Sequence, residues 1–281
     1  MTTASRWGKL RGASARRVCV LLFAAICAAS SAAQEKKKLP PPPTDLPGHV
    51  EYLAAQLYGV PLDESEPLTH EIEKLVLDHM GEWLTVHPPD ANGAGRGSQI
   101  PYDVRVRREL ESVFGKLREP INAGAAAFTA PYQHDRLICL GYELGWSDYN
   151  AVSVTALYEG GDGPMRQVAV AHLVPATNLN YRLLDAPAAG QLWFLVYGTR
   201  QGKSHPRLSA VLYAFDGKTL QPLWKKLDVF DGKISFPAHR IVINYLNEDE
   251  FKRAVTTGGA VTRHEAAYHP GPKGLEVEYD H

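Results

Sequence analysis

The pattern nearest to a metal site is His264-Glu265-Ala266-Ala267-Tyr268-His269. Zinc proteases place two histidines four positions apart on one helix face, with a glutamate as the general base. Here the second histidine comes one position later, so on a helix the two side chains would diverge by about 140°. In a strand or a loop they could still converge. The segment therefore supports one hypothesis, a metal-dependent hydrolase that uses His264, Glu265 and His269.

Other short patterns lack a residue that their chemistry needs. His70-Glu71 is followed by Lys74 where a second histidine would stand. Residues 145–149 (GWSDY) begin like a serine nucleophile elbow but lack its closing glycine. Lys218-Thr219 follows a glycine, as in a phosphate-binding loop, but Leu212 occupies the position of the first glycine. We therefore assign no catalytic, cofactor-binding or metal-binding residue from the sequence and expect no cofactor.

Residues 1–33 have the three parts of a secretory signal peptide. Five basic residues precede an apolar segment at 18–29, and Ser31-Ala32-Ala33 supplies small residues for cleavage. The apolar segment is shorter than the roughly 20 residues of a membrane-spanning helix. We expect export to the periplasm or the exterior, cleavage near Ala33, and a mature chain without a transmembrane anchor.

Removal of this signal would change the charge and the cysteine content. The precursor has 30 Lys and Arg against 31 Asp and Glu, and residues 1–33 carry five of the basic ones, so the mature net charge is −6. A mildly acidic protein gives no reason to expect a nucleic-acid partner. Cys139 would be the one remaining cysteine, and its apolar neighbours predict a buried, unreactive thiol.

The rest of the chain divides into a linker and one folded region. Residues 34–47 are basic and proline-rich, which is typical of an extended linker. Residues 48–281 are predicted to form a single globular domain. Apolar residues recur with the helical period at 44–59, 67–88 and 102–119, and from residue 135 the period changes to two. Helices followed by strands predict the α+β class.

The strands are predicted at 136–144, 152–158, 167–173, 192–197, 208–215, 223–229 and 239–246, with an acidic edge strand at 274–280. Asp216-Gly217 predicts a hairpin with a type I′ turn between two of them. Asn247 is expected to cap a short helix that Glu250 supports and that ends at Gly258. The expected fold is thus a set of N-terminal helices followed by an antiparallel sheet that spans about residues 133–246.

Residues 214–224 (AFDGKTLQPLW) resemble the blade motif of quinoprotein-type β-propellers, which runs Ala-x-Asp-x-x-Thr-Gly-x-x-x-Trp. Leu220 replaces the glycine of that motif, and Asp185 and Trp193 repeat the same spacing upstream. The resemblance implies blade-like antiparallel hairpins and a structural role for Trp224 in docking one blade onto the next. The β region is too short for the four to eight blades of a closed ring. The resemblance gives no cofactor residues.

The functional hypothesis is an exported, non-enzymatic binding or scaffold module whose partner is an unknown protein or a small-molecule ligand. Tyr132, Tyr142, Trp146, Tyr149 and Tyr158 could form a recognition surface, although burial in the sheet is favoured for such large rings. Two alternatives remain open: the metal-dependent hydrolase with His264, Glu265 and His269, and a structural component of the cell envelope.

Overall fold

The computed structural model describes residues 41–281 except 90–99, 134, 148–149, 161–163, 174–176, 188 and 203, and it leaves out the side chains of 135 and 177. The predicted signal peptide and half of the predicted linker, residues 34–40, lie outside this range. The described chain from Pro43 onward forms one compact unit. It contains four α-helices and twelve strands in three antiparallel sheets. The predicted α+β class with N-terminal helices is confirmed.

Three helices and one 3-10 turn precede the sheets: α2 (Leu46–Gln56), η1 (Leu62–Glu64), α3 (Glu66–Val86) and α4 (Tyr102–Val113). Asp45 caps α2 by accepting a hydrogen bond from the Gly48 backbone at 3.1 Å. The third helix is shorter than predicted: it ends at Val113, and Gly115, which has a low helix propensity, follows two residues later. No helix in the described ranges is both long enough and apolar enough to cross a membrane.

Each sheet is a four-stranded meander in which neighbours in sequence are neighbours in space. The first contains β1 (Asn122–Tyr132), β2 (Asp135–Gly145), β3 (Ala151–Glu159) and β4 (Arg166–Leu173). The second contains β5 (Thr177–Leu184), β6 (Leu192–Arg200), β7 (Arg207–Phe215) and β8 (Leu220–Phe230). The third contains β9 (Lys233–Ser235), β10 (Ile241–Leu246), β11 (Arg263–Gly271) and β12 (Gly274–Asp280), with α5 (Glu248–Thr257) between β10 and β11.

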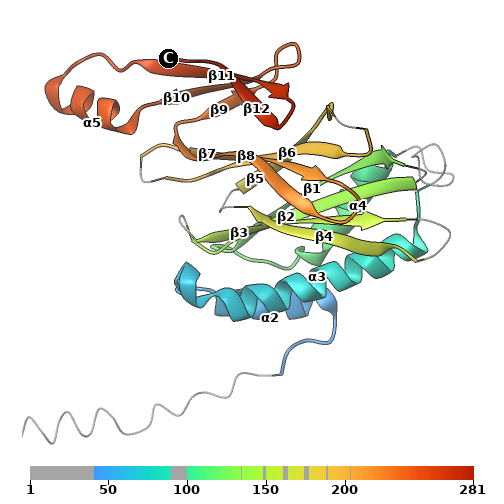
Figure 1. Ribbon diagram of the computed structural model, residues 1–281. Coiled ribbons are helices and arrows are strands. Elements are labelled where there is room, and N and C mark those ends of the chain that lie inside the picture. Colours follow the sequence, from blue (N-terminus) through green and yellow to red (C-terminus); the bar gives the residue numbers. More distant parts are fainter. Residues whose placement is uncertain are drawn as a thin grey trace, which may run out of the picture. The chain divides into compact units, whose positions relative to one another are not determined.

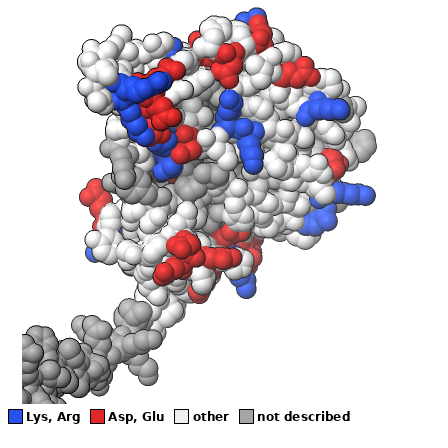
Figure 2. All heavy atoms as spheres, turned by 60° about the vertical axis from the view of Figure 1, so that its left-hand side comes forward, with Lys and Arg blue, Asp and Glu red and all other residues white. Residues whose placement is uncertain are grey.

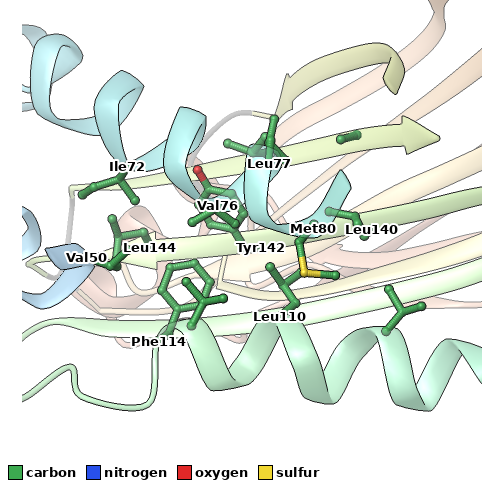
Figure 3. Close-up of a cluster of buried hydrophobic side chains, with 14 of the residues drawn as sticks. Val50, Ile72, Val76, Leu77, Met80, Leu110, Phe114, Leu140, Tyr142 and Leu144 are labelled. Carbon is green, nitrogen blue, oxygen red and sulfur yellow. The ribbon is translucent and has the colours of Figure 1, made fainter. Parts of the chain in front are cut away.

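The helices and the three sheets lie in successive layers (Figure 1). A hydrophobic core lies between each pair of neighbouring layers. The first core lies between the helices and the first sheet, where Met80, Leu110 and Phe114 meet Leu140 and Tyr142 (Figure 3). The other face of the first sheet packs on the second sheet, and the second sheet packs on the third. The first two sheets are therefore apolar on both faces, which explains the unbroken apolar run in β6.

The β region is longer than predicted and is split into three sheets. The prediction omitted β1, β5, β9 and β11. In β1 the run from Ala123 to Ala127 consists of alanine and glycine, which have low strand propensity, and its pairing with β2 determines its conformation. The edge position of β12 is as predicted.

The turn at Asp216-Gly217 joins β7 and β8 as predicted, but it is not a type I′ turn. Only Gly217 has a positive φ, at 94°. The Asp216 carboxylate instead accepts hydrogen bonds from the backbone of Lys218 and Thr219 at 2.9 and 2.7 Å. Side-chain capping of this kind stabilises a four-residue loop without a second left-handed residue.

Most of the predicted recognition aromatics are buried. Tyr132, Tyr142, Trp146 and Tyr158 are at most 5% exposed and belong to the first two cores, while Tyr149 lies outside the described residues. Cys139 is also fully buried, and burial raises the pKa of its thiol, so it is the inert side chain that was predicted.

Candidate functional site

The structure does not bring His264 and His269 together. Both lie on β11, and five positions along a strand place two side chains on opposite faces. His264 Nε2 lies 2.7 Å from Glu250 of α5, whereas His269 Nε2 lies 3.7 Å from Glu276 of β12. Glu265 accepts a hydrogen bond from the Tyr279 hydroxyl. Among the described residues, no group of three or more His, Cys, Asp or Glu side chains is arranged to hold a metal ion.

The other sequence motifs have structural partners. The Ser147 hydroxyl accepts a hydrogen bond from the Asn150 backbone, and Lys218-Thr219 lies in the Asp216 turn. Asn247 caps α5 as predicted, and Gly258 ends it with φ 70°. Glu250 was expected to complete that cap, but its carboxylate is hydrogen-bonded to His264 instead.

A pocket of about 360 Å³ lies between the second and third sheets. We call it the inter-sheet pocket and define it by Lys226 of β8, Tyr245 of β10, Tyr268 of β11 and the first turn of α5 with Glu248 and Asp249. Strand alternation places Tyr268 on the β11 face that packs against the second sheet. Because α5 begins just after β10, its first turn lines the pocket next to that strand.

Tyr268 is the most unusual residue of this pocket. It is 1% exposed, and its ring packs edge-on against Trp224 of β8 with the centroids 5.0 Å apart. Its buried hydroxyl has no partner at the ordinary distance and angle of a hydrogen bond among the described residues, although the Lys226 ammonium lies near enough to interact with it. A buried polar group without a partner costs about 1–3 kcal/mol, so such a group in a native fold calls for an explanation.

Lys226 supplies a cation next to this hydroxyl. Its Nζ lies 5.7 Å from the centroid of the Tyr268 ring and 3.7 Å from an Asp280 oxygen. Burial opposes the charge of the ammonium, but the nearby Tyr268 hydroxyl and Asp280 carboxylate outweigh it, so the pKa of Lys226 is raised. Lys226 therefore stays protonated at neutral pH.

The other charged side chains at the pocket form ion pairs with one another. Arg207 contacts Asp228 at 3.4 Å and Glu248 at 2.7 Å, and Lys252 contacts Glu248 at 2.9 Å. Asp228 sits at a bulge of β8 with a left-handed φ of 60°, which turns its carboxylate toward Arg200 and Arg207. Figure 2 shows acidic and basic side chains interleaved on the side of the molecule where α5 lies.

Two charged side chains of the pocket remain without a close counter-ion. Lys226 has only the 3.7 Å contact with Asp280, whose other oxygen accepts a hydrogen bond from Tyr245 at 2.8 Å. Asp249 has no ion pair within the part of the chain that the structure describes. The lining of the pocket thus includes one ammonium and one carboxylate without a close counter-ion, and the buried Tyr268 hydroxyl belongs to its wall.

Sequence patterns gave no signal for this site. Lys226, Asp249 and Tyr268 are far apart in the chain, and none belongs to a known motif. Tyr268 lies inside the histidine segment, where it counted only as a spacer between possible ligands. The signal that identifies it is its unpaired hydroxyl, which depends on the packing of β11 against β8.

No model of a known protein family matches this chain, and no curated protein is significantly similar to it.

Proposed function

We propose that the mature chain is an exported, non-enzymatic binding module whose inter-sheet pocket takes a small zwitterion of the α-amino acid type. The observation that carries this proposal is the buried Tyr268 hydroxyl, which has no hydrogen-bond partner among the described residues and lies at a pocket beside Lys226.

The donors favour a carboxylate. Tyr268 offers an O–H and Lys226 offers an ammonium, and a carboxylate can accept from both at once. A ligand bound in this way would pair the Tyr268 hydroxyl and complete the weak ion pair of Lys226.

Asp249 favours an amino group on the same ligand, because it is the pocket's carboxylate without a basic partner among the described residues. A volume of about 360 Å³ lies at the small end of the range for ligand pockets. A small zwitterion would leave neither Lys226 nor Asp249 unpaired. Export with cleavage near Ala33 remains part of the proposal, and the intact mass of protein purified after secretion would test it, with Gln34 as the expected first residue.

The test is calorimetric titration of residues 34–281 with a panel of free amino acids, repeated for Tyr268→Phe and Tyr279→Phe. Loss of a hydrogen bond to a charged group corresponds to about 1.5–3 kcal/mol, so Tyr268→Phe should weaken the best ligand by tenfold or more. The control tyrosine, Tyr279, pairs with Ala267 on the other face of the third sheet and should leave affinity unchanged.

Thermal unfolding separates binding from folding. Because the Tyr268 hydroxyl has no described partner, Tyr268→Phe should leave the apo protein at least as stable as wild type. No binding by any amino acid, or equal affinity in Tyr268→Phe and wild type, would refute the proposed ligand class.

A further inference from the structure

We propose a second binding site, for the phosphate group of an organic phosphate, in a cleft of about 620 Å³ between the β5 edge of the second sheet and the loop between β9 and β10 of the third. Its lining includes Arg182 and Leu183 of β5, Asp185, and Phe236, His239 and Arg240 of the loop between β9 and β10. We call it the arginine cleft. No residue is shared with the lining of the inter-sheet pocket.

The loop that forms one wall contains a strained turn. Ala238 and His239 both have left-handed φ values, 38° and 65°, and the Arg240 backbone donates to Pro237 at 2.9 Å. Two consecutive positive φ values with this hydrogen bond are the pattern of a type I′ turn, in which Asn-Gly is the favoured pair. Side chains other than Gly, Asn and Asp are disfavoured at such positions. Despite this backbone strain, the turn contains Ala238 and His239, and it places the His239 imidazole at the cleft.

The cleft also holds guanidinium groups. Arg182 lies over the Phe236 ring, with Cζ 5.4 Å from the centroid, and no carboxylate of the described chain forms an ion pair with it. Arg240 is held at 3.0 Å from Glu278, and Asp185 is the acid that lines the cleft. Stacking on the Phe236 ring orients the Arg182 guanidinium, which has no counter-ion among the described residues.

Phosphate fits this set better than a carboxylate. A phosphate monoester has three terminal oxygens and a carboxylate has two, so phosphate offers more acceptors to the donors that line the cleft, Arg182, His239 and Arg240. The volume exceeds that of a free phosphate ion, and Leu183, which is 41% exposed, and Pro270 offer apolar contacts for an organic group. The ligand class is therefore a phosphate monoester with an apolar body.

The strained turn provides a matched pair of variants. Ala238→Gly and His239→Gly each relieve one left-handed position, so both should keep or raise the unfolding temperature. Only His239→Gly removes a donor. Titration of residues 34–281 with phenyl phosphate should show at least tenfold weaker binding in His239→Gly and in Arg182→Gln, and unchanged binding in Ala238→Gly.

Inorganic phosphate and benzoate are the comparison probes. We expect inorganic phosphate to bind more weakly than phenyl phosphate with the same dependence on His239, and benzoate to bind least. Failure of wild type to bind either phosphate probe would overturn the site. Equal binding by wild type, His239→Gly and Arg182→Gln would do so as well, and a loss confined to Arg182→Gln would exclude the role of the strained turn.

Discussion

At the residue scale, the clearest contact between two sheets is made by the buried Glu143 of β2. It is 6% exposed, and its two carboxylate oxygens accept from the backbone of Asn178 and Leu179 at 2.5 Å each. Asn178 has a left-handed φ of 56° at the irregular start of β5, which turns these two N–H groups toward one anion. Glu143 thereby joins the first sheet to the second.

We predict that Glu143→Gln destabilises the protein by about 1–3 kcal/mol, because an amide N–H₂ cannot accept and one buried N–H would lose its partner. Urea unfolding followed by fluorescence measures the effect. Glu159→Gln is the matched control, since Glu159 forms an ion pair with the exposed Arg166 at 3.0 Å and such surface pairs contribute little. Equal stabilities for the two variants would show that Glu143 does not join the sheets.

Single residues also mark both proposed sites. The buried Tyr268 hydroxyl lacks a well-formed hydrogen bond, and the Ala238-His239 turn has two left-handed backbone positions. Each of these features destabilises the fold locally, and no described contact compensates for it. Proteins retain such costs most often at functional positions. The two proposals therefore share one signature: removal of the Tyr268 hydroxyl or of the His239 side chain should leave folding intact and weaken binding.

At the element scale, the contact between β8 and β11 holds the inter-sheet pocket in shape. Trp224 packs on Tyr268 across the two sheets, and both belong to the third core or contact it. If this contact fixes the Tyr268 ring, the loss of Trp224 should reduce binding as well as stability.

We predict that Trp224→Ala lowers the free energy of unfolding by about 2–3 kcal/mol, below the 3–5 kcal/mol that is typical of a fully buried ring, because Trp224 is only half-buried. The same variant should bind the amino acid ligand at least tenfold more weakly. Trp83, a half-buried tryptophan of α3 at the first core, is the control. Trp83→Ala should reduce stability without changing affinity, and an equal loss of affinity in both variants would contradict a local role for Trp224.

Elements with a strong local signal were predicted from the sequence, and elements shaped by their neighbours were not. The apolar periods of α2 and α3, the alternation in β12 and the Asn247 cap depend on a few consecutive residues. The Ala-rich β1 becomes a strand by pairing with β2, and the three-residue β9 by pairing with β10. Leu117 continues the apolar period of the third helix because it contacts the first core, but it does so from the turn after Val113. The period alone therefore predicted a helix that was too long.

At the scale of the whole molecule, the chain stacks its layers in sequence order: helices, then the first, second and third sheets, each sheet packed on the one before it (Figure 1). Nothing in a local window specifies where one meander stops and the next begins, so the sequence predicted one sheet instead of three. Neither candidate site could be predicted from the sequence for the same reason, because each lies where the second and third sheets meet. The motif-based candidates, His264 and His269, instead lie on opposite faces of a single strand.

The most direct test of the inter-sheet pocket is a crystal structure of residues 34–281 soaked with the amino acid that binds best. We predict that the ligand occupies the pocket, with its carboxylate within hydrogen-bond distance of Tyr268 Oη and Lys226 Nζ and its ammonium facing Asp249. A pocket that holds only water hydrogen-bonded to Tyr268, with the ligand absent or bound elsewhere, would contradict it.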